Sequence, residues 1–366
     1  SVLSASQGVV GGSDLSLEFT RDPDYLDVSW NNFLPQALGR QVVGASWSGF
    51  GHIDGADEIS LGVYHSPNGN SYQSLSFAAS TLVGTDGERL GITISQSDSR
   101  PTDPLLVPLD YKGLSRNVRL TFSNPLIRSR SSTLLIETYL GAQDSNSSMT
   151  TGVPTHDSIR TVGVSLTCDF ALADQSSNLV RLNLEQGLDW LGAQGNSRAN
   201  GSTTFTVVSL DFTRTAPIAT LGSGALSYSF SAQGQCSLGD PLLSAVESSF
   251  GGRQFGRFFD SGSMTGEQSL FGSLELRYAL PLSLGFAEPV HAQFYAFMDA
   301  GLVDQQGVLQ PQELRQRSAA SSGVGVRLGL PHGMNALIEV AFPVSLPAGS
   351  TIDTSERINA SFGVRF

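Results

Sequence analysis

The sequence is short of positive charge and of long apolar runs. Its 366 residues contain one lysine, Lys112, and the formal net charge is −12. Because no basic cluster is present, nucleic acid is not an expected partner. No apolar stretch approaches the roughly 18 residues that a membrane helix needs, which excludes a helical membrane protein. Residues along a membrane-barrel strand alternate in polarity, so averaged hydropathy does not reveal such strands. A β-barrel is therefore not excluded.

Cysteine is scarce, and the common catalytic motifs are missing. The two cysteines, Cys168 and Cys236, allow a disulfide without demanding one. The sequence contains neither H-E-x-x-H nor G-x-S-x-G. His52 and Asp54 suggest a metal or catalytic group, but no third ligand follows at a recognisable spacing, so a solvated turn is favoured. We therefore expect no enzymatic activity, no metal and no cofactor.

From Tyr25 onward the sequence reads as short alternating segments separated by turns. The predicted strands are 25–30, 41–47, 58–65, 72–79, 90–97, 117–123, 132–141, 159–170, 179–191, 203–213, 224–232, 269–281, 291–303, 322–330, 335–344 and 357–366. The length alone suggests two or three soluble domains, but no break in composition divides the chain. Strands of about 8–12 residues in an even number are typical of bacterial outer-membrane barrels.

The predicted connections alternate in length. Those after odd-numbered strands run long, among them 99–114 and 144–156, and those after even-numbered strands are mostly short. Long loops at one end and short turns at the other are typical of outer-membrane barrels. One segment within the longest connection, Pro241–Ser248, can form a short helix.

Alternation within the predicted strands separates an apolar face from a polar one. In 292–302 the apolar face carries Ala292, Phe294, Ala296, Met298, Ala300 and Leu302. A lipid-facing wall around a wet lumen has this pattern, and a soluble sandwich has it with the apolar face inward. Strand number, loop asymmetry and the terminal aromatic residue favour the barrel. We predict an all-β transmembrane antiparallel β-barrel of about 16 strands, with a long loop after strand 11 inserted into the lumen.

The predicted lumen loop covers residues 234–267 and is rich in glycine and aromatic residues. Its candidate functional residues are Gly251, Gly252, Arg253, Arg257, Phe258 and Phe259. Arg257 needs a partner if it is buried. The following strands offer Glu275, with Arg277 beside it, and Asp299 on their lumen faces.

Two motifs in this region carry a resemblance to a known family. Residues 250–259, FGGRQFGRFF, resemble the sixth-loop motif of the TpsB transporters of two-partner secretion, the ShlB/FhaC/HecB type, which are relatives of BamA. The segment from Phe297 through Asp299 to Gly301 is similar to the F-x-D-x-G strand motif of that family, and Phe366 to the terminal aromatic residue of outer-membrane proteins. The resemblance runs from about residue 22 to the end of the chain.

The resemblance implies that Arg257 pairs with Asp299 in the lumen and that Phe366 serves as a C-terminal assembly signal. Phe258 stands where the family motif has glycine, so the loop tip can differ in shape. Residues 22–366 are expected to form the barrel. Residues 1–21 are expected to be the remnant of a preceding POTRA domain or a linker, in a mature or truncated chain.

The resemblance also implies a function. A TpsB-like protein in the bacterial outer membrane exports an unfolded, TpsA-like exoprotein through its lumen. Expected partners are that exoprotein, upstream POTRA domains and the lipid and lipopolysaccharide of the membrane, around a monomeric barrel. A BamA- or TamA-like assembly factor and a passive porin or receptor are the alternatives.

Overall fold

The computed structural model describes residues 2–5, 13–16, 22–69, 71–104, 106–150, 152–282, 290–310, 313–350 and 354–366. Two short strands near the N-terminus, β1 (Val2–Ala5) and β2 (Ser13–Ser16), pair with each other as a separate two-stranded sheet. Two 3₁₀ turns, η1 (Gln36–Leu38) and η2 (Val107–Leu109), lie in connections between barrel strands. Among the described residues, no helix has the length and apolarity needed to cross a membrane.

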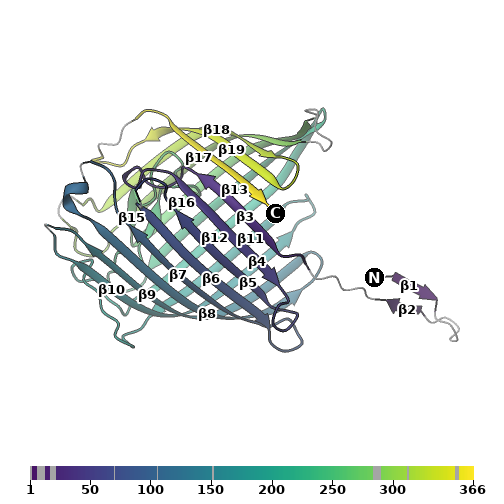
Figure 1. The fold of residues 1–366 in the computed structure, drawn as a ribbon, viewed down its shortest axis with the longest axis horizontal. Coiled ribbons are helices and arrows are strands. Elements are labelled where there is room, and N and C mark those ends of the chain that lie inside the picture. The colour runs from purple at the N-terminus through teal and green to yellow at the C-terminus, as the bar shows by residue number, and fades with distance from the viewer. Residues whose placement is uncertain are drawn as a thin grey trace.

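Sixteen antiparallel strands form a closed barrel, as predicted (Figure 1). They are β3 (Tyr25–Asn31), β4 (Val42–Phe50), β5 (Glu58–His65), β6 (Tyr72–Leu82), β7 (Arg89–Ser99), β8 (Lys112–Arg128), β9 (Ser132–Ser148), β10 (Thr155–Ala171), β11 (Ser177–Gly187), β12 (Thr206–Leu221), β13 (Gly224–Ser237), β16 (Gln268–Leu282), β17 (Val290–Asp304), β18 (Gln316–Gly329), β19 (Met334–Ser345) and β20 (Arg357–Arg365). Each strand pairs with its neighbour in the chain, and β20 pairs with β3 to close the ring.

The alternation along β17 shows why these residues form a barrel wall. Phe294 is 48% exposed and Met298 is 53% exposed, on the outer face, whereas Tyr295, Phe297 and Asp299 are buried on the inner face. In a membrane protein the exposed apolar face lies against lipid, where only a closed sheet satisfies every backbone group. The burial pattern thus assigns Asp299 to the lumen.

The seam between β20 and β3 is the shortest pairing in the ring. Five residue pairs join these strands, from Ser361 with Asn31 to Arg365 with Asp27, whereas sixteen pairs join β9 to β10. Beyond the ladder, Phe366 and Leu26 exchange backbone hydrogen bonds of 2.9 and 3.1 Å. The terminal residue therefore completes one end of the seam.

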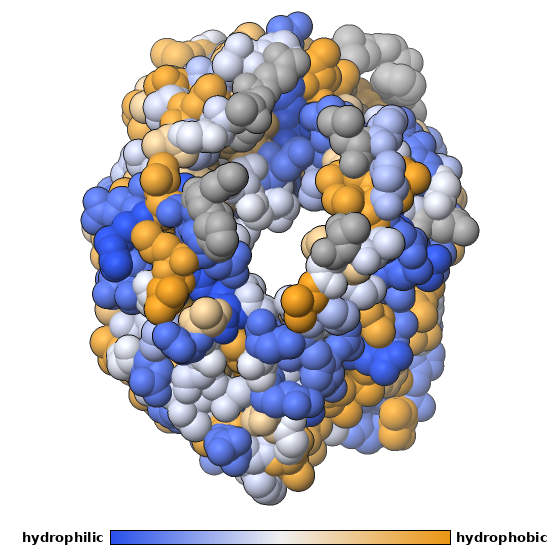
Figure 2. Space-filling view, turned by 90° about the vertical axis from the view of Figure 1, so that its left-hand side faces the viewer, coloured by the Kyte–Doolittle hydropathy of each residue, from blue (hydrophilic) through white to orange (hydrophobic). Residues whose placement is uncertain are grey.

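The two ends of the barrel differ in their connections. Long connections such as 188–205 and 238–267 lie at one end, and short ones such as 129–131 and 222–223 lie at the other. Figure 2 looks onto the end with the long connections, where the molecule is hollowed and an opening runs along its axis. Most of the residues around this opening are hydrophilic or of intermediate hydropathy, with a few hydrophobic ones among them.

Strands β8, β9 and β10 are longer than predicted. The segments 99–114 and 144–156 were expected to be loops, but Lys112 pairs with Ser148 and Ser147 pairs with Thr155 in continuous ladders. These ends are polar, and side chains such as Arg160 and Asp144, 3.0 Å apart, hold neighbouring strands together. Apolar alternation marks only the part of a strand that faces lipid, so the polar extension reads as a loop in the sequence.

Residues 241–248, which could form a short helix, do not form one. Leu242 forms an isolated bridge with Ser202, and a turn follows in which the Val246 N–H donates to the Leu243 carbonyl at 2.9 Å. Leu242 and Leu243 are consecutive and both fully buried. A helix this short is marginal in water, so packing of both leucines decides the backbone conformation. Both cysteines are free.

Candidate functional site in the barrel lumen

One connection, residues 238–267 between β13 and β16, turns into the barrel and is called the long loop here. Its two arms pair as β14 (Ser248–Phe250) and β15 (Met264–Gly266). Residues 251–260, between these strands, form the loop tip. The tip contacts inward-facing residues of β16, β17, β19 and β20, so it lies within the ring that these strands close.

Glycine is required where the tip and the wall come closest. Gly251 has φ of +114°, and a Cβ there would lie 2.0 Å from the Asp260 carbonyl oxygen. On β17, a Cβ at Gly301 would lie 2.3 Å from the ring of Phe250. A side chain at either position would displace the backbone or the ring. Gly301 thus leaves the space that the loop fills with Phe250.

Aromatic rings surround the base of the tip. Phe250 packs on Phe259 and Phe271 with ring centroids 5.8 and 5.4 Å apart. Phe258, which replaces the family glycine, packs edge-on against Phe259 at 5.1 Å and is buried. Each fully buried ring contributes roughly 1.5–3 kcal/mol relative to exposure. Phe258 is therefore accommodated as part of this apolar cluster.

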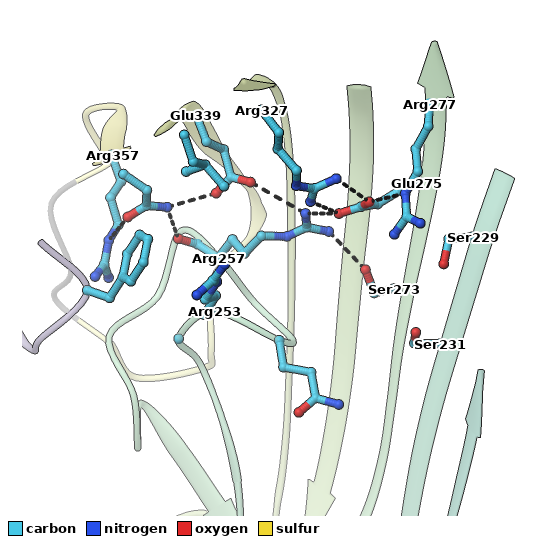
Figure 3. Close-up of a pocket in the computed structure, with 15 residues that line it drawn as sticks. Ser229, Ser231, Arg253, Arg257, Ser273, Glu275, Arg277, Arg327, Glu339 and Arg357 are labelled. Atoms are coloured by element: carbon cyan, nitrogen blue, oxygen red, sulfur yellow. Dashed lines mark hydrogen bonds and ion pairs between the residues drawn. The ribbon is translucent and has the colours of Figure 1, made fainter. Parts of the chain in front are cut away.

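Arg257 lies at the centre of a buried network of carboxylates (Figure 3). Its backbone N–H and Nε each donate to Asp299 Oδ2 at 3.0 Å, and Nη2 donates to Asp299 Oδ1 at 2.8 Å. Nη1 donates to Glu275 Oε1 at 2.5 Å and Glu339 Oε2 at 3.4 Å, and Nη2 donates to Ser273 Oγ at 2.9 Å. The structure therefore brings together Arg257 and Asp299, and it adds further acceptors from two other strands.

Glu275 connects the loop to arginines of the wall. Its carboxylate accepts from Arg277 Nε at 2.6 Å and from Arg327 Nη2 at 2.8 Å, in addition to Arg257. Charge-assisted bonds of this kind are short and strong when every partner is present. Glu275 would thus keep two positive partners if the loop moved away, and its burial does not depend on Arg257 alone.

The face of the Arg257 guanidinium also has a partner. Its Cζ lies 3.6 Å from the centroid of the Phe297 ring, in a cation–π contact. The first and third residues of the Phe297–Gly301 motif therefore contact Arg257, and Gly301 receives Phe250.

Arg253, the other arginine of the tip, lies outside this network. Its Cζ is 5.2 Å from the ring of Phe33, in the connection after β3. A cavity of about 180 Å³ lies between the tip and the wall, lined in part by Gly252, Arg253, Arg277 and Arg327. Arg253 is exposed to this space. The loop tip therefore fills the lumen only partly on this side.

A second buried cluster holds the arms of the long loop. Arg198, from the connection after β11, lies 3.0 Å from Glu247 of the long loop and 2.9 Å from Glu313 of the connection after β17. Gln305 Nε2 donates to both carboxylates and to the Thr265 carbonyl. Three connections thus meet in this cluster, which we call the root cluster.

Charge and burial oppose each other in the root cluster. Burial raises the pKa of Glu247 above its usual range, although Arg198 opposes that effect. Burial alone would lower the pKa of Arg198, but hydrogen bonds with Glu313 and the charge of Glu247 raise it. Glu247 therefore depends on Arg198 to keep its charge, and the buried guanidinium of Arg198 depends on the carboxylates for its partners.

Several residues of the tip network were not singled out from the sequence, among them Ser273, Glu339, Arg327, Arg357 and Asn359. Asn359 Nδ2 donates to the Arg257 carbonyl and to Glu339 Oε1, both at 3.0 Å. Glu339 is a lone acid among apolar residues in the predicted strand 335–344, and this pattern is a usable signal for a lumen-facing partner. The others required knowledge of strand register.

The remaining predicted positions lie elsewhere. Phe366 pairs through its backbone with Leu26 and does not join the tip network. His52 Nε2 lies 2.9 Å from Asp24 Oδ2 in a turn that Asp57 stabilises through backbone N–H groups. Hydrogen bonds from these backbone groups hold the pKa of Asp57 below its usual range, against burial. Within the described ranges no group of three or more His, Cys, Asp or Glu is arranged to hold a metal ion.

The chain is similar to known proteins in sequence and in fold. A family model described as haemolysin secretion/activation protein ShlB/FhaC/HecB matches residues 11–328. No curated protein matches the sequence. Among solved structures, CdiB from Escherichia coli has a TM-score of 0.81 at 17% identity, over 100% of this chain and 67% of its own.

Two further solved structures share the barrel. CdiB from Acinetobacter baumannii has a TM-score of 0.69 at 18% identity, over 94% of this chain and 60% of its own. BamA from Haemophilus ducreyi lacking POTRA domains 1–3 has a TM-score of 0.63 at 14% identity, over 94% of this chain and 70% of its own. At these identities the likeness concerns the fold.

Proposed function

The chain belongs to the haemolysin secretion/activation family of the ShlB/FhaC/HecB type, and from this premise we propose that it exports a partner exoprotein through its lumen. It is a TpsB-type transporter with a sixteen-stranded β-barrel in the bacterial outer membrane. The exported chain is proposed to be an unfolded, TpsA-like exoprotein. POTRA domains upstream, contact with lipopolysaccharide and a monomeric barrel complete the proposed assembly.

The observation that carries the proposal is the ionic attachment of the loop tip. A lumen that exports protein has to be narrowed at rest and widened during transport. Arg257 is held by Asp299, Glu275 and Glu339 through hydrogen bonds and ion pairs. Such bonds can be exchanged for water or for another chain, whereas a covalent link cannot. The tip thus combines a defined resting position with the ability to leave.

We propose that the tip moves when the exoprotein enters. The incoming chain offers backbone and side-chain donors that compete for the carboxylates of the wall. No step requires a nucleotide in this scheme, since folding of the exoprotein outside the cell would give export its direction. Glu275 stays paired during this step because it retains Arg277 and Arg327, whereas Asp299 gives up its bonds with Arg257.

Arg257→Ala tests the proposal. We expect export of the cognate exoprotein into the medium to be abolished while barrel insertion, judged by heat-modifiable mobility in gels, is retained. The reason is that the tip loses its ion pairs with Asp299, Glu275 and Glu339 at once. Arg130→Ala serves as a matched control, since Arg130 is an exposed arginine in the short turn 129–131. That variant should export as the wild type does.

Normal export by Arg257→Ala would contradict the role of the tip. An inserted wild-type barrel that exports nothing and instead passes small solutes would contradict the proposed function as a whole. Planar-bilayer recordings distinguish these cases, because a solute-selective, stably open pore without a protein partner is the behaviour of a porin.

A further inference from the structure

Strand pairing at the seam stops before the end of the barrel that carries the long connections. The ladder between β20 and β3 ends at Ser361 with Asn31. Strand β20 continues beyond this point to Arg357 and stays in its ladder with β19, whereas on the β3 side one further backbone hydrogen bond follows, from the Asn32 N–H to the Ala360 carbonyl at 3.2 Å. We call this part of the seam, residues 357–360 of β20 and the connection 32–41 beyond β3, the upper seam.

Asn32 provides the first side-chain link across the upper seam. Its Nδ2 donates to the Ile358 carbonyl at 2.8 Å, and its Oδ1 accepts from the Ala360 N–H at 2.7 Å. The side chain of Asn32 thus adds to the backbone bond of the same residue and extends the link to Ile358. Among the described residues, no backbone hydrogen bond joins residues 33–41 to β20, so another group is needed to link the two sides there.

That group is the carboxylate of Asp260 in the loop tip. Oδ1 accepts from Arg357 Nη1 of β20 at 2.6 Å. Oδ2 accepts from the backbone N–H of Gln36 at 2.8 Å, and Oδ1 also accepts from Arg40 Nη1 at 3.4 Å. One carboxylate therefore binds both sides of the upper seam.

Neighbouring atoms of the tip strengthen the link to β20. Arg357 Nη1 lies 3.4 Å from the Phe258 carbonyl oxygen, and the Arg257 carbonyl accepts from Asn359 at 3.0 Å. Arg357 is buried, so it would be left without a carboxylate if Asp260 moved away. Removing one partner of a buried ion pair is strongly unfavourable, and Arg357 would seek water by moving.

We propose that Asp260 is a positioning residue that couples the loop tip to closure of the barrel wall. While the tip is seated, the upper seam is closed. When the tip leaves, the upper seam is held by Asn32 alone among the contacts described above and loosens. The inference extends the proposed function from the lumen to the wall, and it rests on that function only for the statement that the tip leaves during export.

Spin labels on the purified full-length transporter test the coupling without any exoprotein. One nitroxide pair, at Ala37 and Glu356, spans the upper seam, where both residues line the hollow beside Asp260. A second pair, at Val28 and Val364, spans the paired part of the seam, where these residues are register partners. Both native cysteines are replaced by serine beforehand.

Asp260→Asn keeps the size of the side chain and removes its charge. We expect loss of dipolar broadening for the pair at Ala37 and Glu356, and no change for the pair at Val28 and Val364. Asp260→Glu should restore the upper signal because it restores the carboxylate. Asp240→Asn removes the same charge from the arm of the same loop, and it should leave both pairs unchanged.

Unchanged dipolar broadening of the pair at Ala37 and Glu356 in Asp260→Asn overturns the coupling. Equal loss of broadening in both pairs also overturns it, because that result would indicate general destabilisation. If Asp260→Asn does not insert into the membrane, Arg40→Gln is used instead, since it removes a contact of Asp260 on the β3 side alone. It should reduce the dipolar broadening of the pair at Ala37 and Glu356 in part, and no change in that broadening would equally overturn the coupling. Failure of the proposed function is seen separately, as an inserted wild-type barrel that exports no protein, whatever the spectra of the two label pairs.

Discussion

The long loop is held at its tip and at its root by an arginine among carboxylates, and the two attachments differ in what supports them. At the tip, Asp299, Glu275 and Glu339 project from strands β17, β16 and β19. At the root, Arg198 and its partners Glu247 and Glu313 all lie on connections. The tip meets a wall that the barrel has already fixed, whereas the root exists only when three connections are assembled.

This difference has an energetic consequence. The strand ladder positions the three carboxylates of the tip site, so seating Arg257 orders mainly the loop itself. Assembling the root orders segments of three connections, and fixing each backbone residue costs roughly 1–2 kcal/mol of conformational entropy. We therefore expect the tip site to act as a defined binding site for Arg257. We expect the root cluster to open by local rearrangement of its three connections.

Among the substitutions that test the difference between the tip and the root, Asp299→Ala is expected to have the largest effect. It removes the carboxylate that binds Arg257 through three donors and leaves that arginine with weaker partners. Loss of one member of a buried pair costs about 3–5 kcal/mol. The tip should leave the lumen, and trypsin should then cleave after Arg253 in intact vesicles.

Asp304→Ala, near the end of the same strand, is the matched control for this experiment. It removes a carboxylate from β17 outside the tip network and should leave Arg253 protected. Equal protection in Asp299→Ala and the wild type would show that the tip does not depend on the strand-borne carboxylates.

Arg198→Ala should have a smaller effect, since loops can rearrange and admit water. A buried group left unsatisfied costs about 1–3 kcal/mol. Glu247 has a raised pKa, so protonation stabilises its folded environment at low pH, and this contribution is lost as pH rises through the raised value. The variant should therefore lose more thermal stability at pH 8 than at pH 5, judged by heat-modifiable mobility.

Arg116→Ala, an exposed arginine near the same end of the barrel, is the control for the root and should show no such pH dependence. A deficit in Arg198→Ala that is equal at both pH values would mean that the carboxylates are not the source of the loss.

Asp27→Asn should have the smallest effect. Asp27 accepts two hydrogen bonds from Arg365 across the seam, at 3.0 and 3.1 Å, so this site too pairs an arginine with a carboxylate. Arg365 is 57% exposed, however, and water screens such a pair. We expect no measurable change in thermal stability, and a clear loss would mean that burial is not what separates these sites.

The sequence allowed the barrel and the centre of the tip site to be predicted, for identifiable physical reasons. Period-two alternation places Asp299 in the lumen, and the motif around Arg257 marks the loop. Arg357 and Asn359 were not found, because their contacts depend on how β20 registers against its neighbours. The root could not be found either, since Arg198 is an isolated arginine in a polar loop and its partners are far away in the chain.

The balance of charge around Arg257 has a consequence for an emptied lumen. With the tip seated, three arginines, Arg257, Arg277 and Arg327, face three carboxylates. Departure of the tip takes Arg257 away from Asp299 and also takes Asp260 away from Arg357, so the wall keeps three arginines, Arg277, Arg327 and Arg357, against three carboxylates. At the places that the tip leaves, two charges of opposite sign lose their partners, the carboxylate of Asp299 on β17 and the guanidinium of Arg357 on β20. Asp299 attracts Arg257 and Arg357 attracts Asp260, so the loop carries its own restoring force.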